Sequence, residues 1–197
     1  MDSRWLVVPT RNDHPDLLAG LVVDCKLPPE RVIVVATESD LTFPMLNTNV
    51  CVLYDVGPTN IQRWWNTGIQ HAESFGAEFV TVVNDDVVLS PKAIPLMVRA
   101  LQRYGSDLCW AAPYITGWCW TLRLASPVRP DERFQWFRGD NDLEQQAFRA
   151  GGVSHTSAGA LHLHPDEFSH TPRIQELIAA DWDAYEKKWE GRDRELD

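Results

Sequence analysis

The sequence predicts an α/β fold, a single domain whose mostly parallel central sheet is flanked by helices. Strand and helix signals alternate through the first half of the chain, which is typical of βαβ units. One predicted strand, 79–83, is continuously apolar, as expected when both faces of a strand are covered. The length of 197 residues is typical of one domain, or of one domain with a short appendage.

The composition argues against several classes of protein. With 44% hydrophobic and 23% charged residues, the chain resembles ordinary globular proteins and not disordered ones. A net charge of -10 repels phosphate backbones and argues against a broad nucleic-acid surface. No apolar run approaches the roughly 20 residues of a membrane span, and the first residues do not read as a secretory signal. We therefore expect a cytoplasmic protein, whose four scattered cysteines are buried apolar side chains.

The first part of the chain carries three strand signals and one helix signal. An apolar run over 5–8 stops at proline and a polar turn, and it predicts the first strand. Pro15 suits a first helical turn, and apolar residues then recur at helical spacing until two prolines end the pattern. The β-branched segments 31–36 and 50–54 predict the second and third strands.

A helix and a fourth strand come next. Thr59 is expected to cap a helix that runs to about residue 75, where Gly76 ends it. The strand 79–83 follows, and it delivers the triplet 84–86, Asn-Asp-Asp, at its carboxyl end.

The second half of the chain is less regular. The elements expected here are a helix over about 90–104, a strand near 108–112, aromatic stretches over 118–124 and 134–137, a helix over 142–150, a strand near 160–164 and a final helix from Pro172. The final helix carries Trp182, Tyr185 and Trp189 on one stripe, which we expect to dock on the core.

The polar triplet is the clearest candidate site. Side chains alternate along a strand, so Asn84 and Asp86 should point together while Asp85 points away or enters the turn. Two adjacent carboxylates after an apolar strand are either solvated in a turn or neutralised by a cation or hydrogen bonds. Oxygen ligands in this position suit Mg²⁺ or Mn²⁺, which often bind a substrate diphosphate as well.

Five segments resemble, in order and separation, those of family-two, GT-A-type glycosyltransferases. NIQRWWNTGIQHAESFGAEFV leads into NDDVVLSP as the family's pattern leads into its DxD-like metal motif. WLVVPTRN and ATESD resemble the opening strand and the nucleotide-contacting loop. DERFQWFRGDNDLEQQAFRAGG resembles a later acidic segment of the family, and HLH is placed like its late histidine. The resemblance covers about 5–164.

The resemblance implies a GT-A-like (Rossmann-like) domain over 1–170. Its nucleotide-binding half would span about 1–90 and its acceptor half about 91–170, while 171–197 would be a C-terminal helix packed on the domain. The implied activity is that of a metal-dependent, inverting, hexosyltransferase-like enzyme. It would move a sugar from a nucleotide-sugar donor to an acceptor hydroxyl, with Mn²⁺ or Mg²⁺ as cofactor.

The metal site follows from the same resemblance. Asp86 is expected to be the main protein ligand, with Asn84 or Asp85 helping directly or through water. Asn84 stands where the family has aspartate. His162 or His164, which share one face of a predicted strand, would complete the site.

The catalytic base is expected near the start of the helix over 142–150. Asp140 aligns with the base of the family, and Asp142 is the second candidate. Asp140 or Asn141 could instead cap the helix, since Asn141 and Glu144 have the spacing of a capping box.

Donor contacts are also carried over from the family. The residues expected to surround the nucleotide are Pro9, Thr10, Arg11, Thr37 and Glu38, the last two replacing a common pair of aspartates. Arg63 and Asn66 would lie near the diphosphate and donor sugar, although an arginine on a helix usually faces solvent. Trp118 and Trp120 would either offer apolar faces to a sugar or pack in the core.

Two other functions fit the sequence. HLHPD with distant aspartates suggests a metal-dependent hydrolase, and the variant metal motif and nucleotide loop suggest a non-catalytic nucleotide-sugar-binding domain. For a transferase, the acceptor is open between a glycan, a lipid carrier, a protein and a modified nucleobase. The oligomeric state is also open.

Overall fold

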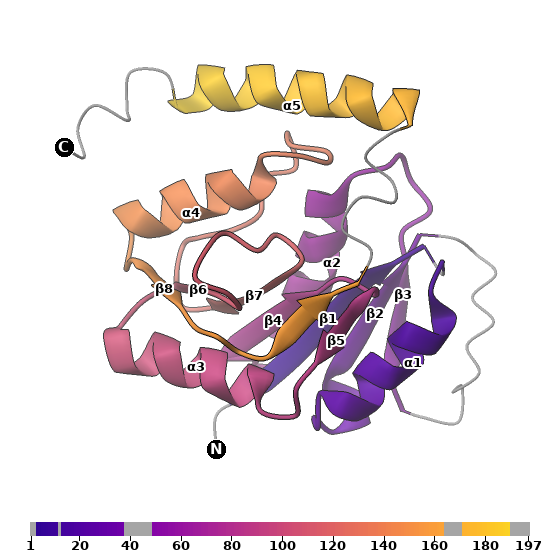
Figure 1. Cartoon of the computed structure of the whole chain (residues 1–197), viewed down its shortest axis with the longest axis vertical. Helices are drawn as coiled ribbons and strands as arrows, with labels where there is room; N and C mark the ends of the chain where they lie inside the picture. Colours follow the sequence, from indigo (N-terminus) through magenta and orange to yellow (C-terminus); the bar gives the residue numbers. More distant parts are fainter. Residues whose placement is uncertain (1–2, 12, 38–48, 164–170, 190–197) are drawn as a thin grey trace.

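The structure, a computed structural model, describes residues 3–11, 13–37, 49–163 and 171–189 (Figure 1). Its strands are β1 (Arg4–Thr10), β2 (Val32–Ala36), β3 (Cys51–Tyr54), β4 (Phe79–Val83), β5 (Val87–Leu89), β6 (Leu108–Trp110), β7 (Cys119–Arg123), β8 (Val153–His155) and β9 (Ala160–His162). Its helices are α1 (Pro15–Asp24), the short 3₁₀ helix η1 (Pro29–Arg31), α2 (Ile61–Ser74), α3 (Ala93–Tyr104), α4 (Gly139–Arg149) and α5 (Pro172–Trp189).

A seven-stranded sheet in the order β3-β2-β1-β4-β7-β6-β8 forms the centre of the molecule. All of its strands run in one direction except β7, which is antiparallel to both of its neighbours. The predicted mostly parallel α/β sheet is therefore confirmed. From β1 the chain adds β2 and β3 on one side and then returns to place β4 on the other side. The switch in strand order thus lies between β1 and β4, and ligands bind beyond the carboxyl ends of strands at such a point.

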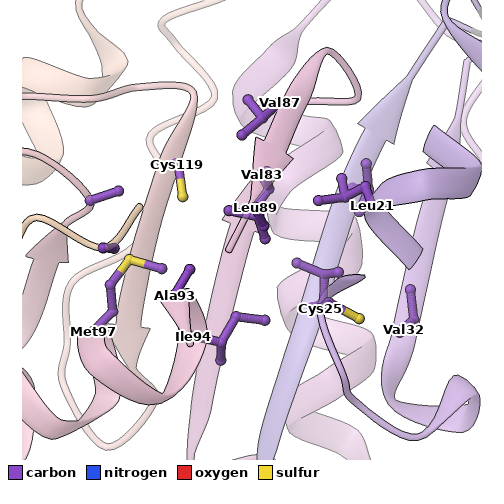
Figure 2. Packing of buried hydrophobic residues seen from close by; sticks show 14 of the residues in the cluster. Leu21, Cys25, Val32, Val83, Val87, Leu89, Ala93, Ile94, Met97 and Cys119 are labelled. Carbon is purple, nitrogen blue, oxygen red and sulfur yellow. The ribbon is translucent and has the colours of Figure 1, made fainter. Parts of the chain in front are cut away.

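Helices cover both faces of the sheet, which explains why the predicted apolar strands have no polar face. Residues of α1 and α3 pack on one face, and Figure 2 shows Leu21, Ile94 and Met97 in this cluster. Residues of α2 and α4 pack on the other face with Trp64 and Leu143. Every position of β2 and β4 is buried as a result.

The helices α1 and α5 start at Pro15 and Pro172, as predicted, whereas the starts of α2 and α4 differ from those predicted. Asn60 caps α2, because its side-chain oxygen accepts the Arg63 amide, and the predicted cap Thr59 does not. The helix α4 starts at Gly139, so Asp140 and Asn141 both lie within its first turn and neither is its cap. The N-cap position belongs to Arg138, whose φ of 60° lies in the left-handed region.

The predicted stripe on the final helix packs against the rest of the chain. Trp189 is buried, and its indole nitrogen donates to Asp142 on α4. The more exposed Trp182 stacks on Phe137, with ring centroids 6.4 Å apart. Figure 1 shows α5 running across the end of the molecule beside α4.

No helix in the described part of the chain is long and apolar enough to cross a membrane. The cytoplasmic location inferred from the sequence stays a prediction.

Candidate active site

A cavity of about 440 Å³ opens where the strand order switches. The end of β1 and the segments that follow β1 and β4 form one part of its wall. The rest of the wall comes from the start of α2, the segment before β7, the start of α4 with the residues before it, and the end of β9. The sequence-predicted site residues that line it are Pro9, Thr10, Arg11, Asn84, Asp85, Asp86, Asp140 and His162, together with Trp118. The structure thus gathers residues that are far apart in the sequence into one site.

A hydrogen bond joins the ends of β1 and β4. The Thr10 hydroxyl donates to Asp85 Oδ2 over 2.5 Å, so Asp85 enters the turn and still lines the cavity. Burial raises the pKa of Asp85 to about 6, the charge of Asp86 adds to the rise, and the hydrogen bond from Thr10 opposes it. All three residues of the triplet therefore line the cavity, instead of Asn84 and Asp86 alone.

Asp86 and His162 form the second polar contact of the site. Val87 pairs with His162 across the small β5–β9 sheet, which brings the imidazole to 3.0 Å between Nε2 and Asp86 Oδ2. Trp118 stacks on the His162 ring, with centroids 5.4 Å apart and planes 16° apart, and so fixes its orientation. The predicted closeness of Asp86 and His162 is present in the structure, whereas His164 lies outside the described residues.

Two oxygens beside this contact are buried and unpaired. Asp86 Oδ1 and Asn84 Oδ1 have no hydrogen-bond partner among the residues that the structure describes. Buried polar atoms are nearly always satisfied, and an unpaired one costs about 1–3 kcal/mol, so these two oxygens are suited to a bound ligand or cation.

The donor chemistry suits a hard divalent ion. Within the described ranges, no three histidine, cysteine or acidic side chains are placed together as a ready-made metal site. The donors present are one carboxylate, one amide oxygen and one imidazole, from Asp86, Asn84 and His162. Oxygen donors of this kind fit Mn²⁺ or Mg²⁺, ions that commonly complete their coordination with water and substrate phosphate.

Asp140 lines the cavity from the first turn of α4. Gly117 provides the room for it, since a Cβ at Gly117 would lie 2.8 Å from Asp140 Oδ2. Burial raises the pKa of Asp140 above its ordinary value, against the opposing effects of the Asn141 amide and the Arg138 charge. A carboxylate with a raised pKa is a stronger base once it is ionised.

The structure does not bring the second base candidate to the cavity. Asp142 is fully buried on another side of α4, because two residues along a helix turn a side chain by about 200°. It accepts hydrogen bonds from Trp189 Nε1 at 2.9 Å and Gln146 Nε2 at 2.7 Å, and it pairs with Lys188 Nζ at 2.5 Å. Asp142 therefore joins α4 to α5 and does not line the cavity.

Two of the expected donor contacts are bound elsewhere. The Arg63 guanidinium makes two hydrogen bonds to Asp55, at 2.7 and 2.8 Å, and a third to the Pro58 carbonyl. Asn66 Nδ2 donates to the Pro130 carbonyl and to Glu132, both at 2.9 Å. Both side chains hold neighbouring segments of the chain and do not line the cavity.

The predicted nucleotide loop is only partly described. The Thr37 amide donates to the Thr10 carbonyl at 3.1 Å, so Thr37 supports a cavity residue without lining the cavity itself. Glu38 lies outside the described residues. Trp120 packs in the core against Trp65 and Trp110, which corrects its alternative role as a sugar contact.

Sequence reasoning missed a mainly apolar part of the wall. The further lining residues are Asp13, His14, Ile61, Gln62, Trp64, Trp65, Ile115, Gly117, Trp136, Phe137 and Gly139. Gln62 Oε1 and the indole nitrogens of Trp64 and Trp65 are buried without a partner in the described structure. The sequence could have indicated the residues at the start of α2, because a helix that follows a parallel strand begins at the carboxyl edge of the sheet, where the site lies.

Comparisons with known proteins identify the family and the fold. The sequence profile described as glycosyl transferase family 2 matches residues 5–160. No curated protein sequence matches the chain. Among solved structures, that of TarS from S. aureus is similar with a TM-score of 0.63 and 15% identity over 92% of this chain. This chain spans only 39% of the length of that TarS chain.

Two structures with bound nucleotides are also similar. TarS 1–349 in complex with UDP has a TM-score of 0.64 and 15% identity, with 92% of this chain and 65% of that chain covered. The mannosyltransferase PcManGT from Pyrobaculum calidifontis, in complex with GDP-Man and Mn²⁺, has a TM-score of 0.67 and 14% identity, with 88% and 60% covered. At such identities these structures show the fold. The profile match, which covers most of the chain, shows that the protein belongs to glycosyl transferase family 2.

Proposed function

We propose that the protein transfers a sugar from a nucleotide-sugar donor to an acceptor hydroxyl, with inversion at the anomeric carbon and with Mn²⁺ or Mg²⁺ as cofactor. One observation carries the proposal: a single cavity holds Asp86 and Asn84, with their unpaired oxygens, and also Asp140 on a separate element. The first pair suits a metal-bound diphosphate, and the third residue suits a general base.

The donor would bind over the ends of β1 and β4. Thr10 and Arg11 line the same cavity as the triplet, where they can contact the nucleotide. Asp86, Asn84 and His162 would hold the ion, which when bound offsets negative charge on the departing nucleoside diphosphate. Without a cation, Asp85 and Asp86 would repel a diphosphate. The nucleotides in the TarS and PcManGT structures support this class of donor.

Asp140 would take the proton of the acceptor hydroxyl as that oxygen attacks the anomeric carbon. It has the burial and the raised pKa of a base, and it lines the same cavity as the proposed donor site. Inversion needs a single displacement in which the base and the leaving diphosphate lie on opposite sides of the sugar. Asp140 lies on α4, on a different element from the proposed metal ligands, and this placement is consistent with that requirement.

The mixed character of the wall fits a polyhydroxylated ring. Trp118 and Trp136 present aromatic surface on which the CH groups of a sugar pack. The unpaired Gln62 Oε1 and the unpaired indole N–H groups of Trp64 and Trp65 supply hydrogen-bond partners for hydroxyl groups.

The test measures release of nucleoside diphosphate from a panel of UDP- and GDP-sugars, with and without Mn²⁺. The wild-type protein should release it with a metal and an acceptor, and Asp86→Ala should lose that activity. The control Asp183→Asn changes an exposed aspartate on α5 and should retain activity. Full turnover by Asp86→Ala, or turnover unaffected by a chelator, would reject the metal-dependent mechanism.

The stereochemistry and the alternative functions are tested by the products. NMR of the first-formed product should show an anomeric configuration opposite to that of the donor, and retention would reject the single displacement. Donor binding without transfer to any acceptor would favour a non-catalytic binding domain. Zinc-restored hydrolysis after chelation would favour a metal-dependent hydrolase.

A further inference from the structure

The helix α5 lies beyond the segment that matches the family, which ends at residue 160, yet it binds the wall of the cavity. Besides its contacts with Asp142 and Asp131, the helix binds the segment 134–138. This segment directly precedes α4 and contributes Trp136 and Phe137 to the cavity. Asp140 follows this segment within the first turn of α4. The position of the proposed base is therefore set next to a segment that α5 holds.

Asp181 makes the central contact between α5 and this segment. Its side chain is 1% exposed, and its carboxylate accepts the backbone N–H groups of three consecutive residues. Oδ1 accepts from Gln135 at 2.9 Å, while Oδ2 accepts from Trp136 and from Phe137, each at 2.7 Å. Hydrogen bonds to an ionised acceptor are roughly twice as strong as neutral ones, and three on one buried group fix this backbone firmly.

The same segment is tied to α2. The Gln135 carbonyl accepts the amide of Ile61, the first residue of α2, at 2.8 Å. A Cβ at Gly139 would lie 2.0 Å from Gln62 Nε2, so the start of α4 also packs closely on the start of α2. The segment is thus held between α5 on one side and the cavity-lining end of α2 on the other.

Arg138 combines an unfavourable backbone conformation with a side-chain contact to α5. Its left-handed φ of 60° is unfavourable for a residue with a side chain, at a cost of about 1–3 kcal/mol. Its guanidinium lies 3.6 Å from the centroid of the Trp182 ring, and Phe137 stacks on the same tryptophan. These contacts, with those of Asp181, hold a backbone conformation that the local sequence does not favour.

We propose that α5 is a strap that fixes the cavity wall, and that Asp181 is the positioning residue through which it holds the backbone from Gln135 into the start of α4. Asp181 does not line the cavity, so it acts through the segment that it binds. The effect on catalysis rests on the proposed function, in which Asp140 must meet the acceptor hydroxyl. A misplacement of about 1 Å can lower a rate by about 100-fold.

The first test separates catalysis from donor binding. Asp181→Asn replaces one accepting oxygen by an amino group that faces N–H donors, and kcat should fall about 10- to 100-fold. The Kd for the nucleoside diphosphate with Mn²⁺ should stay within about twofold of wild type, because Thr10 and the triplet lie on other elements. Asp183→Asn makes the same charge change at an exposed position of α5 and should alter neither quantity.

A second readout does not depend on turnover. Hydrogen exchange of the amides of 135–137 should accelerate in Asp181→Asn and not in Asp183→Asn, measured on the whole 197-residue chain. Trp182→Leu removes the ring contacts of Phe137 and Arg138 and leaves the Asp181 carboxylate in place. It should therefore give the same pattern more weakly, and it remains a test even if Asp181→Asn does not fold. Wild-type exchange and wild-type kcat in both Asp181→Asn and Trp182→Leu would overturn the strap.

The two proposals fail in different ways. If Asp140→Asn abolishes transfer while Asp181→Asn and Trp182→Leu retain wild-type kcat, the base stands and the strap is wrong. If Asp140→Asn retains transfer, the proposed base is wrong. In that case accelerated hydrogen exchange of 135–137 together with a reduced kcat in Asp181→Asn would still support the strap. Wild-type exchange and wild-type kcat in Asp181→Asn would overturn it.

Discussion

Replacing Asp142 should weaken the fold and leave the chemistry intact, although its sequence position also allows it to be the base. The carboxylate is 0% exposed and has three partners, Lys188, Trp189 and Gln146. Removing one member of a buried ion pair typically costs about 3–5 kcal/mol. Lys188 keeps a second carboxylate, because its Nζ lies 2.7 Å from Asp131 Oδ2. The loss in Asp142→Ala should therefore be about 3 kcal/mol, at the lower end of that range, and should come largely from the unpaired indole and amide donors.

Urea unfolding followed by tryptophan fluorescence measures this loss. Asp142→Ala should shift the midpoint to lower urea without changing the slope, and Asp142→Asn, which keeps one acceptor, should lose less. Asp183→Asn should stay within about 0.5 kcal/mol of wild type. At a temperature where it is folded, Asp142→Asn should retain kcat within a few-fold. The reasoning would be refuted if Asp142→Ala were as stable as the wild type. It would also be refuted if folded Asp142→Asn lost its kcat while Asp140→Asn kept full activity.

Three further predictions concern packing, pH and the donor contacts. Gly68→Ala should destabilise the protein by about 1–3 kcal/mol in the same urea assay, because the new Cβ would lie 2.3 Å from Val7 Cγ1. Gly20 on α1 has open space around it, so Gly20→Ala should stabilise the protein by about 0.5–1 kcal/mol. Burial alone would raise the pKa of Asp131, but hydrogen bonds from Arg133 and Lys188 hold that pKa well below its ordinary value. Asp131 should thus contribute its full stabilisation of the folded state above about pH 4, and this contribution should be lost as the pH falls further. In urea titrations at pH values below about 4, the free energy of unfolding of Asp131→Asn should therefore fall less than that of the wild type. Arg63→Ala should leave the donor KM unchanged while lowering the urea midpoint, because the guanidinium is already bound to Asp55 and Pro58; a donor KM raised tenfold would contradict this placement.

Continuous apolar strands were the most predictable part of the fold. β4 spans the predicted residues, Phe79–Val83. A strand that is covered on both faces is a continuous apolar run, which can be recognised from its own residues alone. The triplet after it was therefore placed at the carboxyl edge of the sheet. Its arrangement was less predictable, since Asp85 turns toward Thr10 on another strand.

The errors arise where distant segments determine the local structure. The helix α4 has no side-chain cap, and the backbone before it is held by α5, so capping rules placed its start too late. Asp142 resembles Asp140 in sequence, and only the packing of Lys188 and Trp189 separates their roles. Asn66 similarly has its partners in the segment 130–132, which no local pattern indicates.

The most direct test of the proposed site is a crystal structure with Mn²⁺ and UDP or GDP, with the metal located by its anomalous signal. We expect one manganese peak in contact with the Asp86 carboxylate and with the diphosphate, inside the cavity that Asp140 also lines. A diphosphate bound in this cavity with no metal at Asp86, or a manganese and nucleotide bound elsewhere on the protein, would contradict the account.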